Sequence, residues 1–399
     1  VLLRIASLAP SVRSHFGSSH LRRVLPCDMA EDGNLAKYLA DPKYTGDGPQ
    51  IEGALDRAAD ALRSATALFV VTGAGMSVDS GIPDYRGPSE DAQWGESSEL
   101  TRHYGKSARE LSENASWFQE DPAAAWGCDL RKWISVISDA TPHAGYRILN
   151  HWCERQRDGW FIATSNVDHQ HICSGADQGR VYAIHGEIFG DRARKTLVYQ
   201  CSFDGSDGTG DCPGGLWTTD LERLQIGFDH LKGRVNSESL PRCHECQRPG
   251  RPNYLAFKDS FCRVSAFAFG PKREAMINWL RRLRSSDKSA LVILEIGCGT
   301  VVRNPRNRAE HELEVNPNAA LVRINAHESD TDPRDPRQMS VPLRAEEALL
   351  RLEERLGWCL GPTHQLSDMS GQSPKHECND ESELEFETED WGTDSDVED

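Results

Sequence analysis

A buried strand that runs directly into a glycine turn constrains the fold of this chain more than any other feature. The run Ala67–Val71 is short and apolar and ends in β-branched residues, and Gly73-Ala74-Gly75 follows it. Such runs are typical of buried parallel strands. A strand that ends in Gly-x-Gly is expected to leave backbone amides free to hold a pyrophosphate. The usual third glycine is absent, because Ser77 and Val78 stand there, so the turn alone is weak evidence.

Strand-like and helix-like segments alternate along the chain, which favours a parallel sheet covered on both faces. Residues 186–256 have little periodicity and many Gly, Asp, Cys and Arg, which indicates an inserted small domain. The predicted fold class is α/β, a Rossmann-like parallel-sheet domain with an inserted small zinc-binding domain. The expected helices are 51–65, several stretches within 107–152 broken at Pro122 and Pro142, 272–284 and 343–356; the further strands are 160–164, 290–296 and 320–324.

These segments also predict the domain boundaries. The large domain is expected to comprise residues 46–185 and 266–360, and the small domain residues 186–265. An N-terminal extension of residues 1–45 and an acidic tail of residues 361–399 are expected to flank them. At 399 residues the chain is long enough for two or three compact units.

Charge is concentrated near the end of the chain. The formal net charge is −17, and residues 375–399 contain 12 acidic residues and one lysine. With almost no apolar content, this tail is expected to be disordered. It is either a solubilising segment or a dock for basic partners such as histone-like tails. The acidity argues against sequence-reading contacts with nucleic acid, and no apolar run approaches the roughly 20 residues that span a bilayer.

The start of the chain has a different composition. The first 27 residues contain four arginines, several serines and no acidic residue. This composition fits a mitochondrial transit peptide. It equally fits translated upstream sequence, because the chain begins with Val1 and its first methionine is Met29. We expect a start at Met29 and a cytoplasmic or nuclear protein, with a mitochondrial location as the alternative if residues 1–28 are a genuine transit peptide.

Four of the 12 cysteines are candidate zinc ligands: Cys201, Cys212, Cys243 and Cys246. Cys243-x-x-Cys246 has the spacing of half a zinc site, and the wider gap after Cys201 can form a loop at small entropic cost. Four thiolates leave no open coordination position, so the zinc would be structural. Two alternatives stay open: His244 replaces one thiol, or the two pairs are unrelated. The remaining cysteines are interpreted as free thiols rather than a disulfide framework.

Polar residues follow two other apolar runs. Asn166 and Asp168 come just after residues 160–164, at the strand end where such folds bind ligands. His185-Gly186 follows the run Val181–Ile184. An imidazole has a reference pKa of about 6.5 and can accept a proton near neutral pH. Taken alone, Asn or Asp at a helix start is more often a cap, and a lone histidine is more often structural.

Several of these segments resemble the sirtuins, the NAD-dependent protein lysine deacylases. Gly73–Arg86 resembles the NAD-binding loop G-A-G-x-S-x-x-S-G-I-P-D-[FY]-R, and Thr164–His171 resembles T-Q-N-[IV]-D-x-L-H, with Ser165 and Gln170 as departures. His185-Gly186 stands where the family keeps its catalytic H-G. Arg251–Asp259 resembles the strand that pairs with the substrate backbone, although Lys258 replaces a glycine.

Two later segments continue the resemblance. Glu295–Thr300 resembles the glycine-rich turn under the NAD phosphates and ribose, with either Gly297 or Gly299 as its first glycine, and Arg323–Glu328 matches I-N-x-x-E near the adenosine ribose. The resemblance covers residues 51–356 and is closest to a bacterial-like branch with Trp-rich helices (Trp126, Trp133). It implies that NAD binds to Gly73, Ala74, Gly75, Ser77, Pro83, Asp84, Tyr85, Arg86, Ser165, Asn166, Asp168, Gly297, Gly299, Thr300, Asn325 and Glu328.

The resemblance also implies a reaction. The acyl-lysine oxygen would attack the ribose of NAD as nicotinamide leaves, and His185 would act as general base on a ribose hydroxyl, giving lysine and O-acyl-ADP-ribose. Two alternatives stay open. One is a mono-ADP-ribosyltransferase or NAD glycohydrolase on the same site, which Ser165 and Lys258 leave room for. The other is a non-enzymatic NAD-binding scaffold. Acyl preference, protein substrate and oligomeric state do not follow from the sequence.

Overall fold

The computed structural model describes residues 49–82, 84, 115–130, 134–191, 195–203, 212, 215–256, 259 and 270–358. Contacts divide the chain into Val1–Cys359 and Leu360–Asp399, and the second unit lies outside the described residues. The domain boundaries expected from the sequence stay predictions. Within the described ranges, every helix is too short or too polar to cross a membrane.

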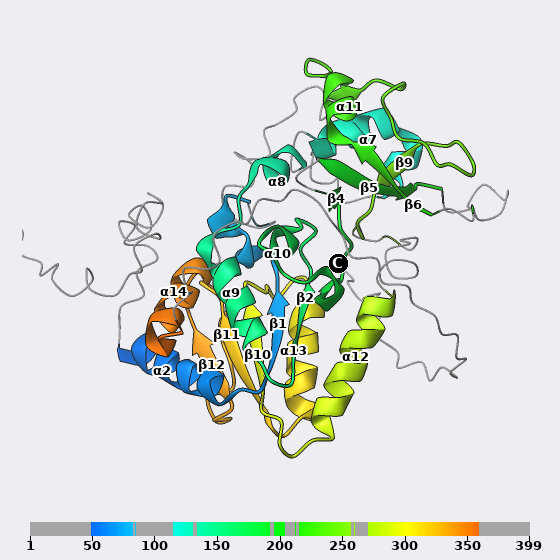
Figure 1. Ribbon diagram of the computed structural model, residues 1–399. Coiled ribbons are helices and arrows are strands. Elements are labelled where there is room, and N and C mark those ends of the chain that lie inside the picture. The colour runs from blue at the N-terminus through cyan, green and yellow to red at the C-terminus, as the bar shows by residue number, and fades with distance from the viewer. Residues whose placement is uncertain are drawn as a thin grey trace, which may run out of the picture. The chain divides into compact units, whose positions relative to one another are not determined.

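A six-stranded parallel sheet forms the centre of the first unit (Figure 1). Most of its strands are short apolar runs, and β1 (Ala67–Thr72) is buried along its whole length. Because β1 pairs with β10 on one side and β2 on the other, the chain reverses its direction across the sheet at β1. Such a switch point is where open α/β sheets bind ligands. The strand order is β12 (Gln338–Val341), β11 (Ala319–Ile324), β10 (Leu291–Ile296), β1 (Ala67–Thr72), β2 (Trp160–Thr164) and β3 (Val181–Ala183).

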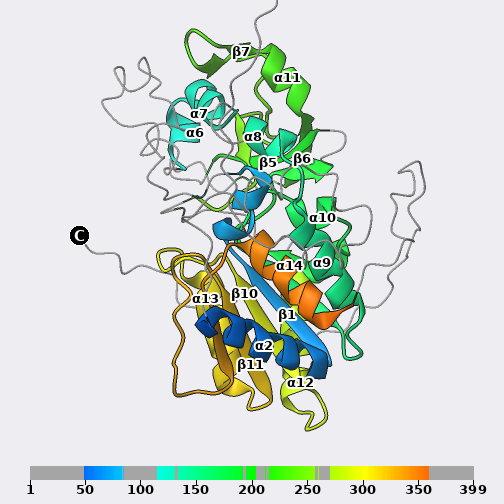
Figure 2. The ribbon, with the colours of Figure 1, turned by 90° about the vertical axis from the view of Figure 1, so that its left-hand side faces the viewer.

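Helices cover both faces of this sheet, as the two ribbon views show (Figure 2). On one face, α12 (Gly270–Arg284) and α13 (Asn304–Val315) pack Trp279, Leu280 and Leu313 against Phe69 and Ile293. The opposite face is covered by α2 (Pro49–Ser64), α9 (Ala144–Glu154) and α14 (Ala345–Leu356), and α14 contacts both of the other helices. The predicted α/β class and its main helices and strands are therefore confirmed.

A second, antiparallel sheet carries the cysteine-rich segment. It comprises β4 (Phe189–Asp191), β5 (Thr196–Cys201), β6 (Leu216–Asp220) and β9 (Gly250–Pro252), with the helix α11 (Leu221–Ile226) and the small hairpin β7 (Phe228–Asp229) and β8 (Arg234–Val235) beside it. The sequence predicts a small domain here but no strands, because β4 and β9 have three residues each and β5 and β6 do not alternate regularly between apolar and polar residues.

Helices from before the insert pack against this second sheet. These are α6 (Trp117–Glu120) and α7 (Pro122–Asp129), while the short α8 (Ser135–Asp139) follows them. Trp117, Phe118 and Trp126 share a hydrophobic cluster with Leu197 and Tyr254. The helical pattern is broken at Pro122, as predicted: α6 ends just before it and Pro122 begins α7, which fits its fixed φ and missing N–H. The small module therefore draws on residues that the predicted boundaries assign to the large domain.

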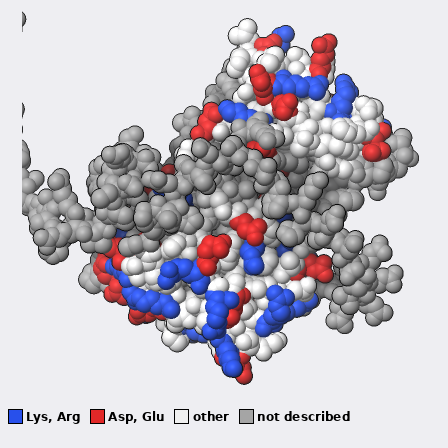
Figure 3. Space-filling model, viewed as in Figure 1, with Lys and Arg blue, Asp and Glu red and all other residues white. Residues whose placement is uncertain are grey.

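The remaining short elements connect the strands to their loops. The 3-10 turns η2 (Ala74–Met76) and η3 (Val78–Ser80) follow β1, α10 (Gln170–Cys173) follows β2, and η5 (Gln178–Arg180) precedes β3. Figure 3 shows basic and acidic side chains interspersed over the described part of one face.

Candidate functional site

The predicted site residues follow five neighbouring strands at one edge of the parallel sheet. Gly73–Ser77 follow β1, Ser165–Asp168 follow β2, and His185 follows β3. Gly297–Thr300 follow β10, and Asn325–Glu328 follow β11. Because all these strands are parallel and adjacent, their carboxyl ends meet at this edge. Asp84 is described and half-buried, whereas Pro83, Tyr85 and Arg86 lie outside the described residues.

The glycine turn differs from the prediction in one respect. The N–H of Gly73 donates to the carbonyl of Ile296 (3.0 Å) and that of Gly75 to the carbonyl of Gly297 (3.0 Å). These amides are therefore not free for a pyrophosphate, because the loop after β10 packs directly on the turn. Among Gly73–Ser77, the N–H of Ala74 is the one with no hydrogen-bond partner within the described residues, so it is left for an anion.

Close backbone contact explains why glycines stand in this turn. A Cβ on Gly73 would lie 2.7 Å from the Gly297 carbonyl oxygen, and one on Gly75 would lie 2.7 Å from the Gly297 Cα. We expect Gly75→Ala to destabilise the chain by about 1–3 kcal/mol, since backbone cannot rotate away as a side chain can. Gly53→Ala is the control, because nothing lies within 4 Å of its added Cβ in α2. That variant should be more stable by about 0.5–1 kcal/mol. Urea unfolding measures both, and equal effects would contradict the packing explanation.

A buried hydrogen-bond network joins the turn after β1 to the loop after β2. Ser77 Oγ donates to Asp168 Oδ2 (2.5 Å) and accepts from Asn166 Nδ2 (3.0 Å). It also lies 3.0 Å from the Tyr146 hydroxyl. Asn166 Nδ2 further donates to the carbonyl of Gly73 (2.9 Å). Asp168 is only 5% exposed, and its Oδ1 accepts the N–H of Gln170. The network fixes both loops in one geometry.

Two further histidines support the turn, and sequence reasoning did not identify them. His143 Nε2 lies 2.8 Å from the Met76 carbonyl, and its Nδ1 accepts the N–H of Gly145 at the start of α9. The ring therefore donates at Nε2 and is neutral. Burial lowers the pKa of His143. Burial also lowers the pKa of His171 to about 3, and the Nε2 of His171 lies 3.0 Å from the Thr72 hydroxyl. Two sequence signals could have indicated these histidines: Pro142 directly precedes His143, and His171 ends the segment Thr164–His171.

His185 lies beside the loop after β2. Burial lowers the pKa of its imidazole below 6.5, and a hydrogen bond to the Ser165 backbone partly offsets this effect. The N–H of Ser165 in turn donates to the carbonyl of Thr72 (3.0 Å) at the end of β1. The imidazole is therefore tied, through one residue, to the strand that leads into the glycine turn. His185 is thus linked through Ser165 to the end of β1, and its catalytic role stays a prediction.

The segment predicted to pair with a substrate backbone is attached at the same place. The N–H of Leu255 donates to the carbonyl of His185 (2.8 Å), and Asn253 N–H donates to Val198. Arg251 forms a buried ion pair with Asp259 (2.7 Å). Residues 253–255 therefore lie beside the histidine, between the two sheets. Lys258, the departure from the family pattern, is outside the described residues.

Four thiols form the predicted metal site. The sulfurs of Cys201, Cys212, Cys243 and Cys246 all lie within 4.8 Å of one another. The Cys201–Cys246 and Cys212–Cys243 sulfurs are 3.6 and 3.5 Å apart. A zinc ion with bonds of about 2.3 Å to four sulfurs in a tetrahedron needs edges of roughly 3.8 Å, so the donors fit zinc. The two cysteine pairs form one cluster. His244 is exposed and lies against Trp217, with ring centroids 4.9 Å apart.

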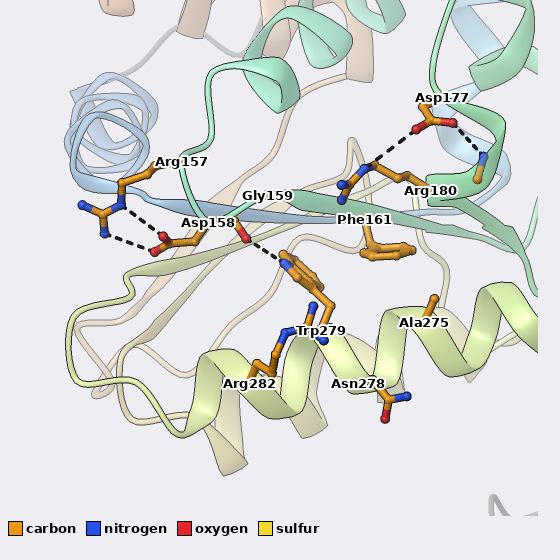
Figure 4. Close-up of a pocket in the computed structure, with 11 residues that line it drawn as sticks. Arg157, Asp158, Gly159, Phe161, Asp177, Arg180, Ala275, Asn278, Trp279 and Arg282 are labelled. Atoms are coloured by element: carbon orange, nitrogen blue, oxygen red, sulfur yellow. Dashed lines mark hydrogen bonds and ion pairs between the residues drawn. The ribbon is translucent and has the colours of Figure 1, made fainter. Parts of the chain in front are cut away.

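A cavity of about 680 Å³ lies at the opposite, amino end of β2 (Figure 4). Two of its arginines form ion pairs with neighbouring aspartates: Arg157 with Asp158 at 3.0 Å, and Arg180 with Asp177 at 3.8 Å. The ring of Trp279 donates to the Asp158 carbonyl (2.8 Å). We assign the cavity no ligand, since it shares no residue with the strand ends described above.

Comparisons with known proteins indicate the family of this chain. A model of the Sir2 family matches residues 73–200. An NAD-dependent protein deacylase of Deinococcus radiodurans is 32% identical over 146 residues, which cover 36% of this chain and 54% of that protein. An NAD-dependent protein deacetylase of Haloarcula marismortui is 30% identical over 196 residues, covering 46% of this chain and 68% of that protein.

Solved structures support the same fold. A sirtuin studied for its substrate affinity aligns with a TM-score of 0.50 and 20% identity, covering 74% of this chain and 96% of the other. A Sir2 protein bound to a propionylated peptide aligns with a TM-score of 0.50 and 18% identity, covering 76% and 99%. At these identities the structural likeness concerns the fold alone.

Proposed function

Because the chain belongs to the Sir2 family, we propose that it is an NAD-dependent protein lysine deacylase. The observation that carries the proposal is the position of His185. Its ring bonds to the Ser165 backbone beside the glycine turn, and its carbonyl accepts the N–H of Leu255 in the segment that resembles a substrate-pairing strand. A base between a nucleotide turn and a peptide-binding strand can act on both substrates at once.

The polar groups at the strand ends fit NAD. Ala74 offers an N–H to a phosphate oxygen, while Asn325, Glu328 and Thr300 offer an amide, a carboxylate and a hydroxyl to ribose. Asn166 and Asp168 hold Ser77 next to them. NAD supplies the anomeric carbon to which the acyl oxygen bonds as nicotinamide leaves. These roles, like those of Pro83, Asp84, Tyr85 and Arg86, are part of the proposal.

His185 supplies the proton chemistry. In its neutral form the imidazole accepts the proton of a ribose hydroxyl as that oxygen attacks the acyl carbon. The lysine amine then leaves with that proton, and one water molecule adds to complete O-acyl-ADP-ribose. Burial favours this role because it keeps the ring neutral at physiological pH. Residues 253–255 hold the peptide, so that positioning contributes to the rate. The thiol cluster serves only the structure, since four sulfurs saturate zinc.

The proposal extends to partners and location. We propose acyl-lysine proteins as substrates, with basic, histone-like segments favoured by the 12 acidic residues of 375–399. We further propose a cytoplasmic or nuclear location, with the mitochondrion as the alternative if residues 1–28 act as a transit peptide.

Product analysis tests the function directly. The chain is incubated with NAD and with acetyl-, succinyl- or long-chain acyl-lysine peptides, and the masses of peptide and nucleotide products are measured. We expect nicotinamide, free lysine peptide and O-acyl-ADP-ribose in equal amounts for at least one acyl group. Label transferred to protein without release of lysine would indicate an ADP-ribosyltransferase instead. NAD consumption that does not depend on peptide would indicate a glycohydrolase, and NAD binding without turnover would indicate a scaffold.

A further inference from the structure

Two loops at the edge of the candidate site are joined by their side chains. The loop Gly297–Thr300 follows β10 and the loop Asn325–Glu328 follows β11. Thr300 donates its N–H (2.8 Å) and its hydroxyl (2.6 Å) to the two carboxylate oxygens of Glu328. Asn325 Nδ2 donates to the carbonyl of Cys298 (2.9 Å). The groups offered to ribose therefore depend on each other's positions.

Beneath them, the guanidinium of Arg306 on α13 joins the same two loops. Its Nη2 donates to the carbonyl of Cys298 (2.9 Å) and to that of Glu328 (2.6 Å). Arg306 is 5% exposed, so both bonds are shielded from water. Bonds from a charged donor are among the stronger ones in proteins. One buried side chain thus sets the spacing between the backbones of both loops.

The carboxylate of Glu295 offsets the cost of burying the Arg306 guanidinium. It is 0% exposed on β10, and its Oε1 lies 3.4 Å from Arg306 Nε. The same carboxylate binds Arg323 through two hydrogen bonds of 2.8 and 2.9 Å. A buried guanidinium without a partner would be strongly destabilising. The pairing therefore holds Arg306 in place under the loops.

A lysine could not replace this arrangement. Position 306 requires a planar group with several donors, because its side chain must reach two carbonyls and one carboxylate. The ammonium of lysine is instead a compact point charge on a flexible stem. Gly299 adds a second constraint, because a Cβ there would lie 3.2 Å from Glu328 Oε2. The glycine leaves room for the Glu328 carboxylate to face Thr300.

We propose that Arg306 is a positioning residue for the adenosine half of NAD. It holds Thr300, Asn325 and Glu328 in the arrangement that receives the ribose hydroxyls, and does not itself touch the nucleotide. The proposal rests on the proposed function, since it requires that the chain bind NAD. In open α/β folds a carboxylate at such a crevice accepts the ribose hydroxyl, and fixing it before binding avoids the cost of ordering it then.

Arg306→Lys tests the proposal, with Arg308→Lys as the matched control. Arg308 lies on the same helix, is similarly buried and pairs with Glu312 at 2.6 Å. ADP-ribose affinity is measured by calorimetry, alongside KM for NAD, KM for peptide, kcat and nicotinamide inhibition. We expect Arg306→Lys to weaken ADP-ribose binding and raise KM for NAD by about 10-fold or more. The kcat, the peptide KM and nicotinamide inhibition should change by less than about threefold, and Arg308→Lys should leave ADP-ribose binding near wild type.

Two results would overturn the proposal: unchanged ADP-ribose affinity in Arg306→Lys, or equal losses in both variants, which would indicate general destabilisation. If Arg306→Lys does not fold, Gly299→Ala provides a second test, because its Cβ would crowd the Glu328 carboxylate at 3.2 Å without touching the buried ion pairs. Unchanged ADP-ribose affinity there would equally overturn it. A wild-type chain that binds ADP-ribose without deacylating peptide would refute the proposed function. The ratio of the ADP-ribose affinities of wild type and Arg306→Lys would still decide the role of Arg306. A wild-type chain that does not bind ADP-ribose would refute both.

Discussion

Replacing His185 by alanine is expected to lower NAD-dependent deacylation by about 10²–10⁴-fold, the range for loss of a general base. The substitution removes the imidazole that is proposed to accept the ribose proton. In the wild type this ring hydrogen-bonds to the Ser165 carbonyl, beside the turn after β1. The rate at saturating NAD and peptide measures the effect. His151→Ala is the control, because His151 is also partly buried but bonds to Trp358 on the outer helix layer. Equal loss in both variants, or full activity of His185→Ala, would refute the role.

The pH dependence of the wild-type rate follows from the same ring. Burial lowers the pKa of His185, and the Ser165 backbone only partly offsets it. Only the neutral imidazole accepts a proton, so activity is present above the folded-state pKa and is lost as pH falls through it. Because that pKa is below 6.5, we expect the acid limb of kcat to have its midpoint below pH 6.5. A midpoint above pH 6.5, or the same limb in His185→Ala, would contradict this assignment.

Removal of zinc should unfold the small module. Structural zinc contributes about 10–16 kcal/mol in small domains, as much as or more than the roughly 5–15 kcal/mol that stabilises a typical protein. The four thiols fasten the end of β5 to the turn Cys243–Cys246, and Trp217 packs against them. Cys243→Ser, or a chelator, should abolish bound zinc and the cooperative unfolding of this module. Metal analysis and near-ultraviolet circular dichroism measure the two effects.

Cys128→Ala is the matched control for this experiment. Cys128 is buried in the neighbouring hydrophobic cluster but is not one of the four clustered thiols. The variant should keep one zinc per chain. Native stability and zinc content in Cys243→Ser would show that the thiols do not hold a structural metal. Activity lost on chelation should return when zinc is restored and the module refolds, since a zinc held by four thiolates is structural.

Much of the parallel sheet could be predicted because four of its strands are largely apolar runs of five or six residues. Residues 67–71, 160–164, 290–296 and 320–324 are found as β1, β2, β10 and β11 with small shifts at their ends. The strands around the thiols were missed because β4 and β9 have only three residues each and β5 and β6 lack a regular alternation of apolar and polar residues. The thiol cluster was nevertheless predicted, since ligand type and Cys-x-x-Cys spacing identify a zinc site without any knowledge of the strands.

Other features depend on which surfaces meet, and no local pattern encodes that. The helical pattern before Trp126 gives a helix but not its partner, which is the second sheet. Gly73 and Gly75 were interpreted as a phosphate cradle, whereas their N–H groups bond to Ile296 and Gly297, more than 200 positions away. Arg306 also escaped notice, because its role appears only when two distant loops lie above one guanidinium.

The register of β1 has a consequence for how this protein is made. One edge of β1 pairs with residues 160–164, but the other pairs with residues 291–296. A nascent chain that has not reached residue 291 therefore exposes an apolar strand with unsatisfied backbone groups, which invites association with other chains. The centre of the parallel sheet can form only after residues 291–296 have been synthesised. Pairing between strands so far apart in the sequence is slow. We expect chaperone dependence during translation, and aggregation of fragments that end before β10.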